Sequence, residues 1–188
     1  MPNRDTRWVI SGGIGSGKSA VRKLLDDRDF FTVDADSVGH AVLEPGGPAF
    51  DEVAERWPEV VERGEIDRAA LGNLVFADRE QLRELEGMTH PHIFGIIRRR
   101  VEENQGPVAV EVPILEHRLG DRWKTVIVDC HDEIRLKRLV DRGMSDESAR
   151  ARMAAQPSRG EWLARADLVV PNHGSLGELA STLALLAS

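Results

Sequence analysis

Several features that define other classes of protein are scarce or missing in these 188 residues. The chain has one cysteine, Cys130, which excludes an internal disulfide and favours a reducing compartment. No apolar run reaches the length of a membrane-spanning helix, and no apolar segment of the signal-peptide type stands near the N-terminus. We therefore expect a cytoplasmic protein that has no membrane partner.

Excess positive charge is also missing from this chain. The net charge of −7 argues against non-specific binding of nucleic acid or of anionic membranes, although local arginines still allow small anionic ligands. Hydrophobic residues make up 41% and charged residues 30%, which is typical of one globular domain with a small inserted lobe. We expect a monomer or a weakly associating homo-oligomer.

Lysine is rare in this chain, yet one lysine stands in its most informative motif. The run Gly12-Gly-Ile-Gly-Ser-Gly-Lys-Ser19 matches the phosphate-binding pattern G-x-x-x-x-G-K-[ST]. The apolar run Trp8–Ser11 precedes it, and apolar residues at helical spacing follow it. A strand, a glycine turn and a helix start are the context that such a loop requires. The sequence therefore predicts a phosphate-binding loop, the P-loop.

This loop binds phosphate through backbone N–H groups and through the positive end of the helix that follows. Lys18 is expected to reach the β- and γ-phosphates, and the Ser19 hydroxyl to bind Mg²⁺. The residues expected to contact the nucleotide here are Gly13, Ile14, Gly15, Ser16, Gly17, Lys18, Ser19 and Ala20.

Apolar strands alternate with amphipathic helices along most of the chain, which predicts an α/β fold with a five-stranded parallel sheet flanked by helices. Asp132 and Ser145 are expected to be N-caps of two of these helices. The predicted strands are Trp8–Ser11, Phe30–Asp34, Val108–Val112, Thr125–Asp129 and Asp167–Val170.

Residues 37–103 follow a different pattern, with several helical apolar stripes, a cap at Asp67 and no convincing strand. A crossover between parallel strands needs only about a dozen residues. The excess length predicts a helical substrate-binding insertion in a nucleotide-binding core made of residues 1–36 and 104–188.

Acidic residues stand at the carboxyl ends of the predicted strands, where ligands bind in open α/β sheets. Asp34 and Asp36 follow the second strand, and Asp36 is either a base for an acceptor hydroxyl or a helix N-cap. Glu111 is either a carboxylate near Mg²⁺ or substrate, or a solvated charge. Asp129 is either a Walker B carboxylate or part of a helix-initiating turn.

Basic residues crowd the segment between residues 135 and 165. They coincide with a helical lid predicted at about residues 142–164, which in small P-loop kinases closes over the triphosphate. One or two are expected to be catalytic, and the others to form a solvated helix face. The members are Arg135, Lys137, Arg138, Arg142, Arg150, Arg152, Arg159 and Arg165.

Two histidines flank a proline in the run His90-Pro91-His92. Histidines two positions apart do not share a helix face, and no third ligand is near in sequence, so a zinc site is not expected. His90 stands at the head of a predicted amphipathic helix and is interpreted as a cap or a substrate contact.

Taken in order, these motifs resemble bacterial dephospho-coenzyme A kinases along nearly the whole chain. The P-loop alone fits many kinases, whereas the ordered set is more specific. The other matching pieces are Val33-Asp-Ala-Asp36, Pro45-Gly46, Ile66-Asp-Arg68 with Leu71 and Val75-Phe76, His90-Pro91-His92-Ile93, Pro113, Arg138-Leu139 with Arg142, Gln156, and Ala166-Asp167 followed by Asn172 and Gly174.

The resemblance implies that MgATP phosphorylates the ribose 3′-hydroxyl of dephospho-CoA, which completes coenzyme A. By position it makes Asp36 the base and assigns the contact with ATP phosphates to Arg138, to Arg142 or to both. It places Asn172 near the adenine and His90 in the substrate lobe. Asp34, Glu111 and Pro113 are further expected substrate-site residues.

The chain departs from the family pattern around the third strand. Glu111 stands where the family usually has Asp, and the run Pro113-Ile-Leu-Glu116 is one residue short. The runner-up hypothesis is therefore another small-molecule P-loop kinase, with a nucleoside monophosphate or an alcohol as acceptor. A third is a nucleotide-sensing module or GTPase switch, and the missing Asn-Lys-x-Asp guanine motif disfavours the switch.

Overall fold

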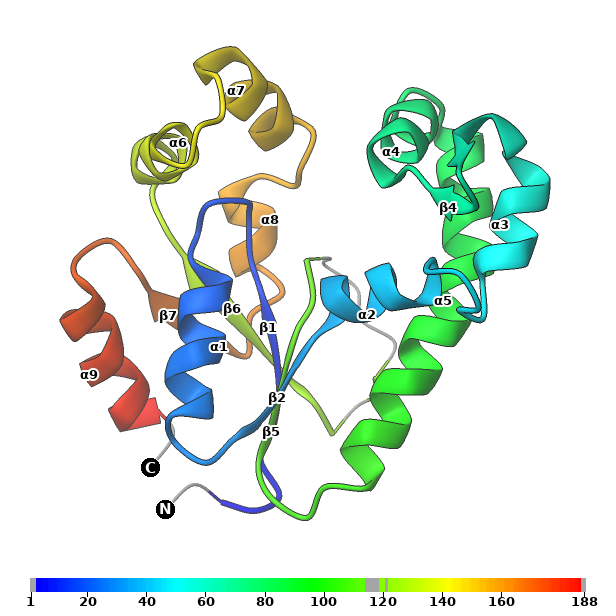
Figure 1. The fold of residues 1–188 in the computed structure, drawn as a ribbon. Coiled ribbons are helices and arrows are strands. Elements are labelled where there is room, and N and C mark those ends of the chain that lie inside the picture. The colour runs from blue at the N-terminus through cyan, green and yellow to red at the C-terminus, as the bar shows by residue number, and fades with distance from the viewer. Residues whose placement is uncertain (1–2, 114–118, 121, 187–188) are drawn as a thin grey trace. The chain divides into compact units, whose positions relative to one another are not determined.

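The computed structural model describes residues 3–113, 119–120 and 122–186. The chain divides into two compact units, one formed by residues 1–34 and 103–188 and the other by residues 35–102 (Figure 1). The second unit begins two residues before the predicted insertion and ends one residue before it. Among the described residues, no helix has both the length and the apolar character that crossing a membrane requires.

The first unit is built on a parallel sheet of five strands in the order β2-β5-β1-β6-β7, which confirms the predicted fold class. The central position of β1 places the end of that strand, and the loop after it, between two neighbours on each side. The strands are β1 (Arg7–Ser11), β2 (Phe31–Asp34), β5 (Val108–Glu111), β6 (Lys124–Asp129) and β7 (Leu168–Pro171). The helices are α1 (Lys18–Asp26), α6 (Asp132–Asp141), α7 (Asp146–Ala154), α8 (Arg159–Leu163) and α9 (Leu176–Leu186).

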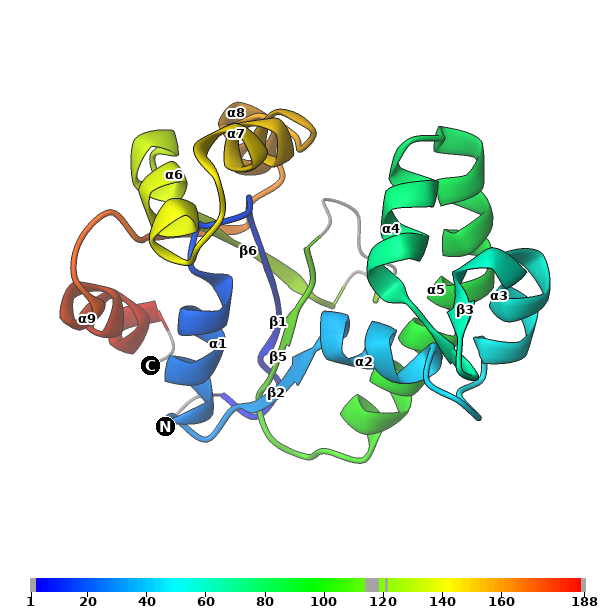
Figure 2. The same cartoon turned by 45° about the horizontal axis from the view of Figure 1, so that its top comes forward.

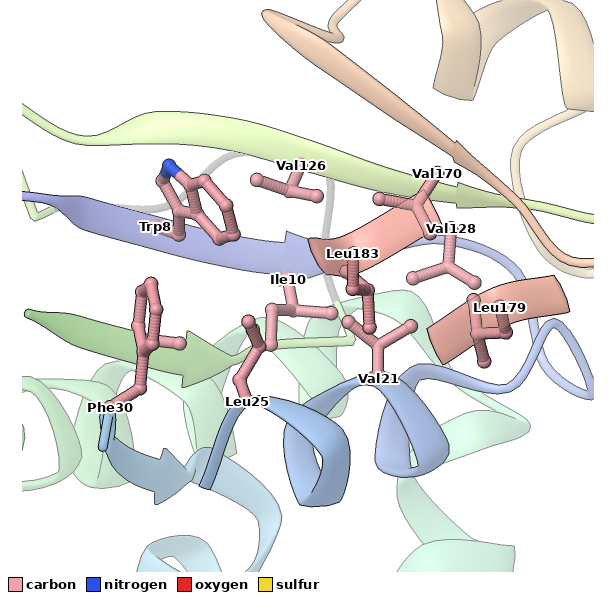
Figure 3. Close-up of a cluster of buried hydrophobic side chains, with 11 residues drawn as sticks. Trp8, Ile10, Val21, Leu25, Phe30, Val126, Val128, Val170, Leu179 and Leu183 are labelled. Atoms are coloured by element: carbon pink, nitrogen blue, oxygen red, sulfur yellow. The ribbon is translucent and has the colours of Figure 1, made fainter. Parts of the chain in front are cut away.

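Helices α1 and α9 pack side by side against the sheet, and their apolar faces close its main core (Figure 3). Val21 and Leu25 are one turn apart on α1 and both are fully buried, so the spacing of the sequence places them on one face. Burial of each such side chain is worth about 1.5–3 kcal/mol. This packing fixes the start of α1 relative to the end of β1.

The predicted caps are partly right. The Ser145 hydroxyl accepts the Ser148 N–H at the start of α7, and the Asp67 carboxylate accepts two N–H groups at the start of α4. The prediction for Asp132 is wrong, because His131 is the N-cap and Asp132 is the first residue of α6. There Asp132 supports the helix through its charge at the positive end.

The second unit is mainly helical, but it also contains a two-stranded antiparallel hairpin that was not predicted from the sequence. Strands of two residues are too short to give an alternating pattern. The elements are α2 (Ala35–Val42), α3 (Phe50–Arg56), the 3-10 helix η1 (Pro58–Val60), β3 (Val61–Glu62), β4 (Glu65–Ile66), α4 (Arg68–Phe76) and α5 (Arg79–Glu102). Figure 2 shows α2 and α4 each beside the long helix α5.

Candidate active site

The P-loop motif forms the turn between β1 and α1. Gly15 and Gly17 have φ angles of 79° and 100°, which are costly for residues with a side chain, and α1 begins directly afterwards at Lys18. The first turn of α1 contains no acidic residue of its own, and its N–H groups form the positive end of the helix. The turn therefore has the geometry that phosphate binding requires.

Lys18 folds back over this loop. Its Nζ donates to the Gly12 carbonyl at 2.9 Å and to the Gly13 carbonyl at 3.3 Å. These bonds hold the ammonium group within the loop, beside the backbone groups that are expected to receive phosphate.

Side chains from distant parts of the sequence bind the same loop. The Arg138 Nη1 lies 3.2 Å from the Ser16 carbonyl, and the Asn172 Nδ2 lies 2.7 Å from it. Arg138 also donates to the Asn172 side chain at 3.3 Å. The structure thus brings two predicted residues together at the loop, whereas Arg142 is exposed at the C-cap of α6.

Two further contacts to the loop were not predicted from the sequence. The Arg135 Nε donates to the Ile14 carbonyl at 2.8 Å, and the Ile14 N–H donates to the Gln156 side chain at 2.7 Å. More than a hundred residues separate both side chains from the loop, so no local pattern could reveal these contacts. In the sequence, Arg135 belongs to the basic segment and Gln156 to the family pattern. These memberships were the only signals that either residue could lie near the loop.

A second group of polar side chains lies at the ends of β2 and β5. Asp34 and Glu111 are register partners on these neighbouring strands. The Ser19 hydroxyl donates to one Glu111 oxygen at 2.9 Å, and the Arg22 Nε donates to the other at 2.9 Å. Arg22 also lies 3.6 Å from Asp34. Glu111 is only 7% exposed, so the interpretation of it as a solvated charge is wrong.

These oxygens fit a magnesium ion better than a transition metal. The described residues contain no group of three or more His, Cys, Asp or Glu side chains that could hold a metal. Mg²⁺ usually binds one or two protein oxygens and completes its shell with phosphates and water. The Ser19 hydroxyl and the Glu111 carboxylate supply the hard oxygen donors for that arrangement.

Asp129 at the end of β6 is held by a different partner. Arg159 binds both of its oxygens at 2.7 Å, and the His173 Nε2 lies 3.4 Å away. The hydrogen bonds from Arg159 hold the pKa of the Asp129 carboxyl below its ordinary value. Both oxygens are thus used to fix the first residue of α8, and the Walker B role of Asp129 stays a prediction.

The predicted lid segment carries a pocket between α6, α7 and α8. It has a volume of about 650 Å³ and is lined in part by Arg135, Arg150 and Arg159. Arg150 is paired with Asp146 on the exposed face of α7, as expected for a solvated helix charge. Cys130, directly after β6, is buried, and burial raises the pKa of its thiol.

Asp36 belongs to the second unit. It is the second residue of α2, whose first residue is Ala35, so the N-cap interpretation of Asp36 is wrong. Its side chain is exposed, and a carboxylate in the first turn is favourable for the helix. The proposed role as a base remains a prediction.

His90 does not stand at the head of a helix, which corrects the cap interpretation. Helix α5 runs from Arg79 through Pro91 to Glu102, and His90 packs edge-on against Phe94 with ring centroids 5.7 Å apart. Proline removes one N–H that would bind the Gly87 carbonyl, but Gly87 is exposed, so water can bind that oxygen. Burial of Phe94 and Ile97 favours the continuous helix.

Pro113 follows β5 and is half-buried. The shortened run after it, residues 114–116, lies outside the described residues, so its predicted effect on the acceptor remains a prediction.

A family model and two named relatives identify one family. The family model described as dephospho-CoA kinase matches residues 8–178. A dephospho-CoA kinase from Corynebacterium glutamicum is 41% identical over 182 residues, which cover 92% of this chain and 91% of that protein. A crystal structure from Thermus thermophilus has a TM-score of 0.84 at 35% identity and covers 97% and 96% of the two chains. The dephospho-CoA kinase from Campylobacter jejuni has a TM-score of 0.68 at 25% identity, with 96% and 94% covered.

Proposed function

The chain belongs to the dephospho-CoA kinase family and catalyses the last step of coenzyme A biosynthesis, and we propose which residues carry out each part of this reaction. ATP, the donor that kinase chemistry implies, binds the P-loop, and the acceptor is the ribose 3′-hydroxyl. The P-loop with Lys18 folded over it carries this proposal, because only the phosphate donor needs such a loop.

Lys18, Arg138 and the start of α1 bind and orient the phosphates. Positive charge held in place before the reaction stabilises the transferring phosphoryl group without further reorganisation. The chemistry that Mg²⁺ supplies is charge neutralisation on the phosphate oxygens. Ser19 and Glu111 would hold the ion, since their oxygens are already positioned next to each other.

Asp36 accepts the proton of the acceptor hydroxyl. Three observations support this role of Asp36: it lies just after β2, its carboxylate is exposed, and it belongs to the Asp-Ala-Asp motif. His90 and Asn172 contact the acceptor and the adenine, respectively, as their positions in the family pattern imply.

The activity is tested by mixing the purified protein with ATP, Mg²⁺ and dephospho-CoA and measuring coenzyme A and ADP. We expect stoichiometric formation of both products. Turnover of a nucleoside monophosphate, but not of dephospho-CoA, would instead establish the runner-up kinase. ATP binding without any acceptor turnover would indicate a binding module.

The role of Asp36 is tested with Asp36→Asn, which keeps the size of the side chain and removes its basicity. We expect turnover to fall by about 10²–10⁴-fold while the Kd for ATP stays within about twofold, because the base acts only on the acceptor. Asp51→Asn is the matched control, since Asp51 is another exposed carboxylate in the first turn of a helix of the same unit. Near-normal turnover of Asp36→Asn would reject Asp36 as the base.

A further inference from the structure

Arg135 lies in the second turn of α6 and reaches the P-loop. Its side chain is only 6% exposed. Nε donates to the Ile14 carbonyl at 2.8 Å, and Nη1 pairs with Asp132 at 2.7 Å. These two bonds fix the guanidinium in one orientation against the loop.

The third nitrogen, Nη2, is buried and has no hydrogen-bond partner among the described residues. It occupies the space that a side chain on Gly13 would need. A buried donor without a partner costs about 1–3 kcal/mol, and an apolar side chain of similar length would avoid that cost. The stability of the fold therefore does not account for an arginine at this position.

The backbone of α6 also touches the loop at this point. A Cβ on Gly15 would lie 2.8 Å from the Arg135 carbonyl oxygen, so the helix and the loop are in close contact. Arg135 therefore meets three consecutive loop residues, namely Gly13, Ile14 and Gly15. It is well placed to fix the loop backbone and to bring a permanent positive charge to it.

We propose that Arg135 is a positioning residue for nucleotide binding. It holds the Ile14 carbonyl on the α6 side, so that the loop keeps its N–H groups in the arrangement that receives phosphate. Its charge, buried in a region of low dielectric, adds to the attraction for the phosphates. The inference rests on the proposed function only in taking the P-loop as the site of the nucleotide phosphates.

The experiment compares Arg135→Met with the full-length parent protein. Methionine fills similar space but lacks both the charge and the donors. Lys137→Met is the matched control, because Lys137 loses the same charge on the same helix and its side chain is 74% exposed. For each protein the Kd for ADP is measured by calorimetry, the Tm by thermal unfolding, and the KM for dephospho-CoA by turnover.

We expect the Kd for ADP to rise about tenfold in Arg135→Met, while Tm changes by no more than about 2 °C. The KM for dephospho-CoA and all values for Lys137→Met should stay unchanged. A residue with only a structural role would lower Tm and leave the Kd of the folded protein unchanged. An ADP affinity equal to that of the parent would overturn the inference.

Arg135→Lys keeps the inference testable if the methionine variant does not fold. Lysine retains the charge but cannot reproduce the fork of the guanidinium, so we expect an intermediate loss of about threefold in ADP affinity. Parent-like ADP affinity in this variant would show that the guanidinium geometry is not needed. Because ADP binding requires no acceptor, this result is independent of whether dephospho-CoA is turned over.

Discussion

Gly13 offers a direct test of how tightly Arg135 is held against the P-loop. Its φ angle lies outside the left-handed region, so an alanine is acceptable to the backbone itself. The obstacle is space, because a Cβ there would lie 2.5 Å from the Arg135 Cζ and still closer to Nη2. We predict that Gly13→Ala destabilises the protein through this contact alone.

The size of this destabilisation follows from the contacts that Arg135 would lose. The side chain is buried and bonded to Ile14 and Asp132, so it cannot move without breaking charge-assisted hydrogen bonds. Such overpacking costs about 1–3 kcal/mol of unfolding free energy. In Gly13→Ala the ADP affinity should also fall, because the displaced guanidinium no longer holds the Ile14 carbonyl.

The assay is a double-mutant cycle measured by urea unfolding with Gly13→Ala, Arg135→Ala and both together. Removing Arg135 makes room for the new methyl group, so the double variant should be more stable than the sum of the single effects predicts, by about 1–2 kcal/mol. Strictly additive effects, or a Gly13→Ala protein as stable as the parent, would refute this reasoning about the contact.

Three other predictions concern the core, the carboxylate at the end of β6 and the magnesium ion. Leu25→Ala should lower the unfolding free energy by about 2–5 kcal/mol in urea titrations, because Leu25 is fully buried between α1 and the sheet. The lowered pKa of Asp129 stabilises the fold above the ordinary carboxyl pKa, and this stability is lost as pH falls through the lowered value. Arg159→Met should therefore reduce stability at pH 7 but have little effect near pH 2, and an equal loss at both would contradict the pairing. Glu111→Gln should weaken the Mg²⁺-dependent part of ADP binding by about tenfold or more, with ADP binding in EDTA unchanged as the control.

Much of the first unit could be predicted because its signals are local. Each sheet strand begins and ends within one residue of its predicted bounds, since a short valine-rich run bounded by polar residues is typical of a buried parallel strand. The start of α1 at Lys18 likewise follows from the glycine turn before it. These features depend on residues that are neighbours in sequence.

The failures have a common cause in packing. The proline at position 91 predicted a helix boundary, yet α5 continues because Phe94 and Ile97 are buried along it and Gly87, whose carbonyl loses its helical partner, is an exposed residue. Glu111 has no local pattern that separates a bound carboxylate from a solvated one. Only helix α1, which packs beside β5, supplies Ser19 and Arg22 as its partners.

The sequence by itself determined that this chain has a phosphate-binding loop between a strand and a helix, because backbone conformation at glycine and helical spacing are local properties. Tertiary structure alone decided which side chains hold that loop in shape. Arg135, Arg138, Gln156 and Asn172 reach it from elements more than a hundred residues away. The physical reason is that hydrogen bonds depend on distance in space, which the sheet order β2-β5-β1-β6-β7 sets and linear spacing does not.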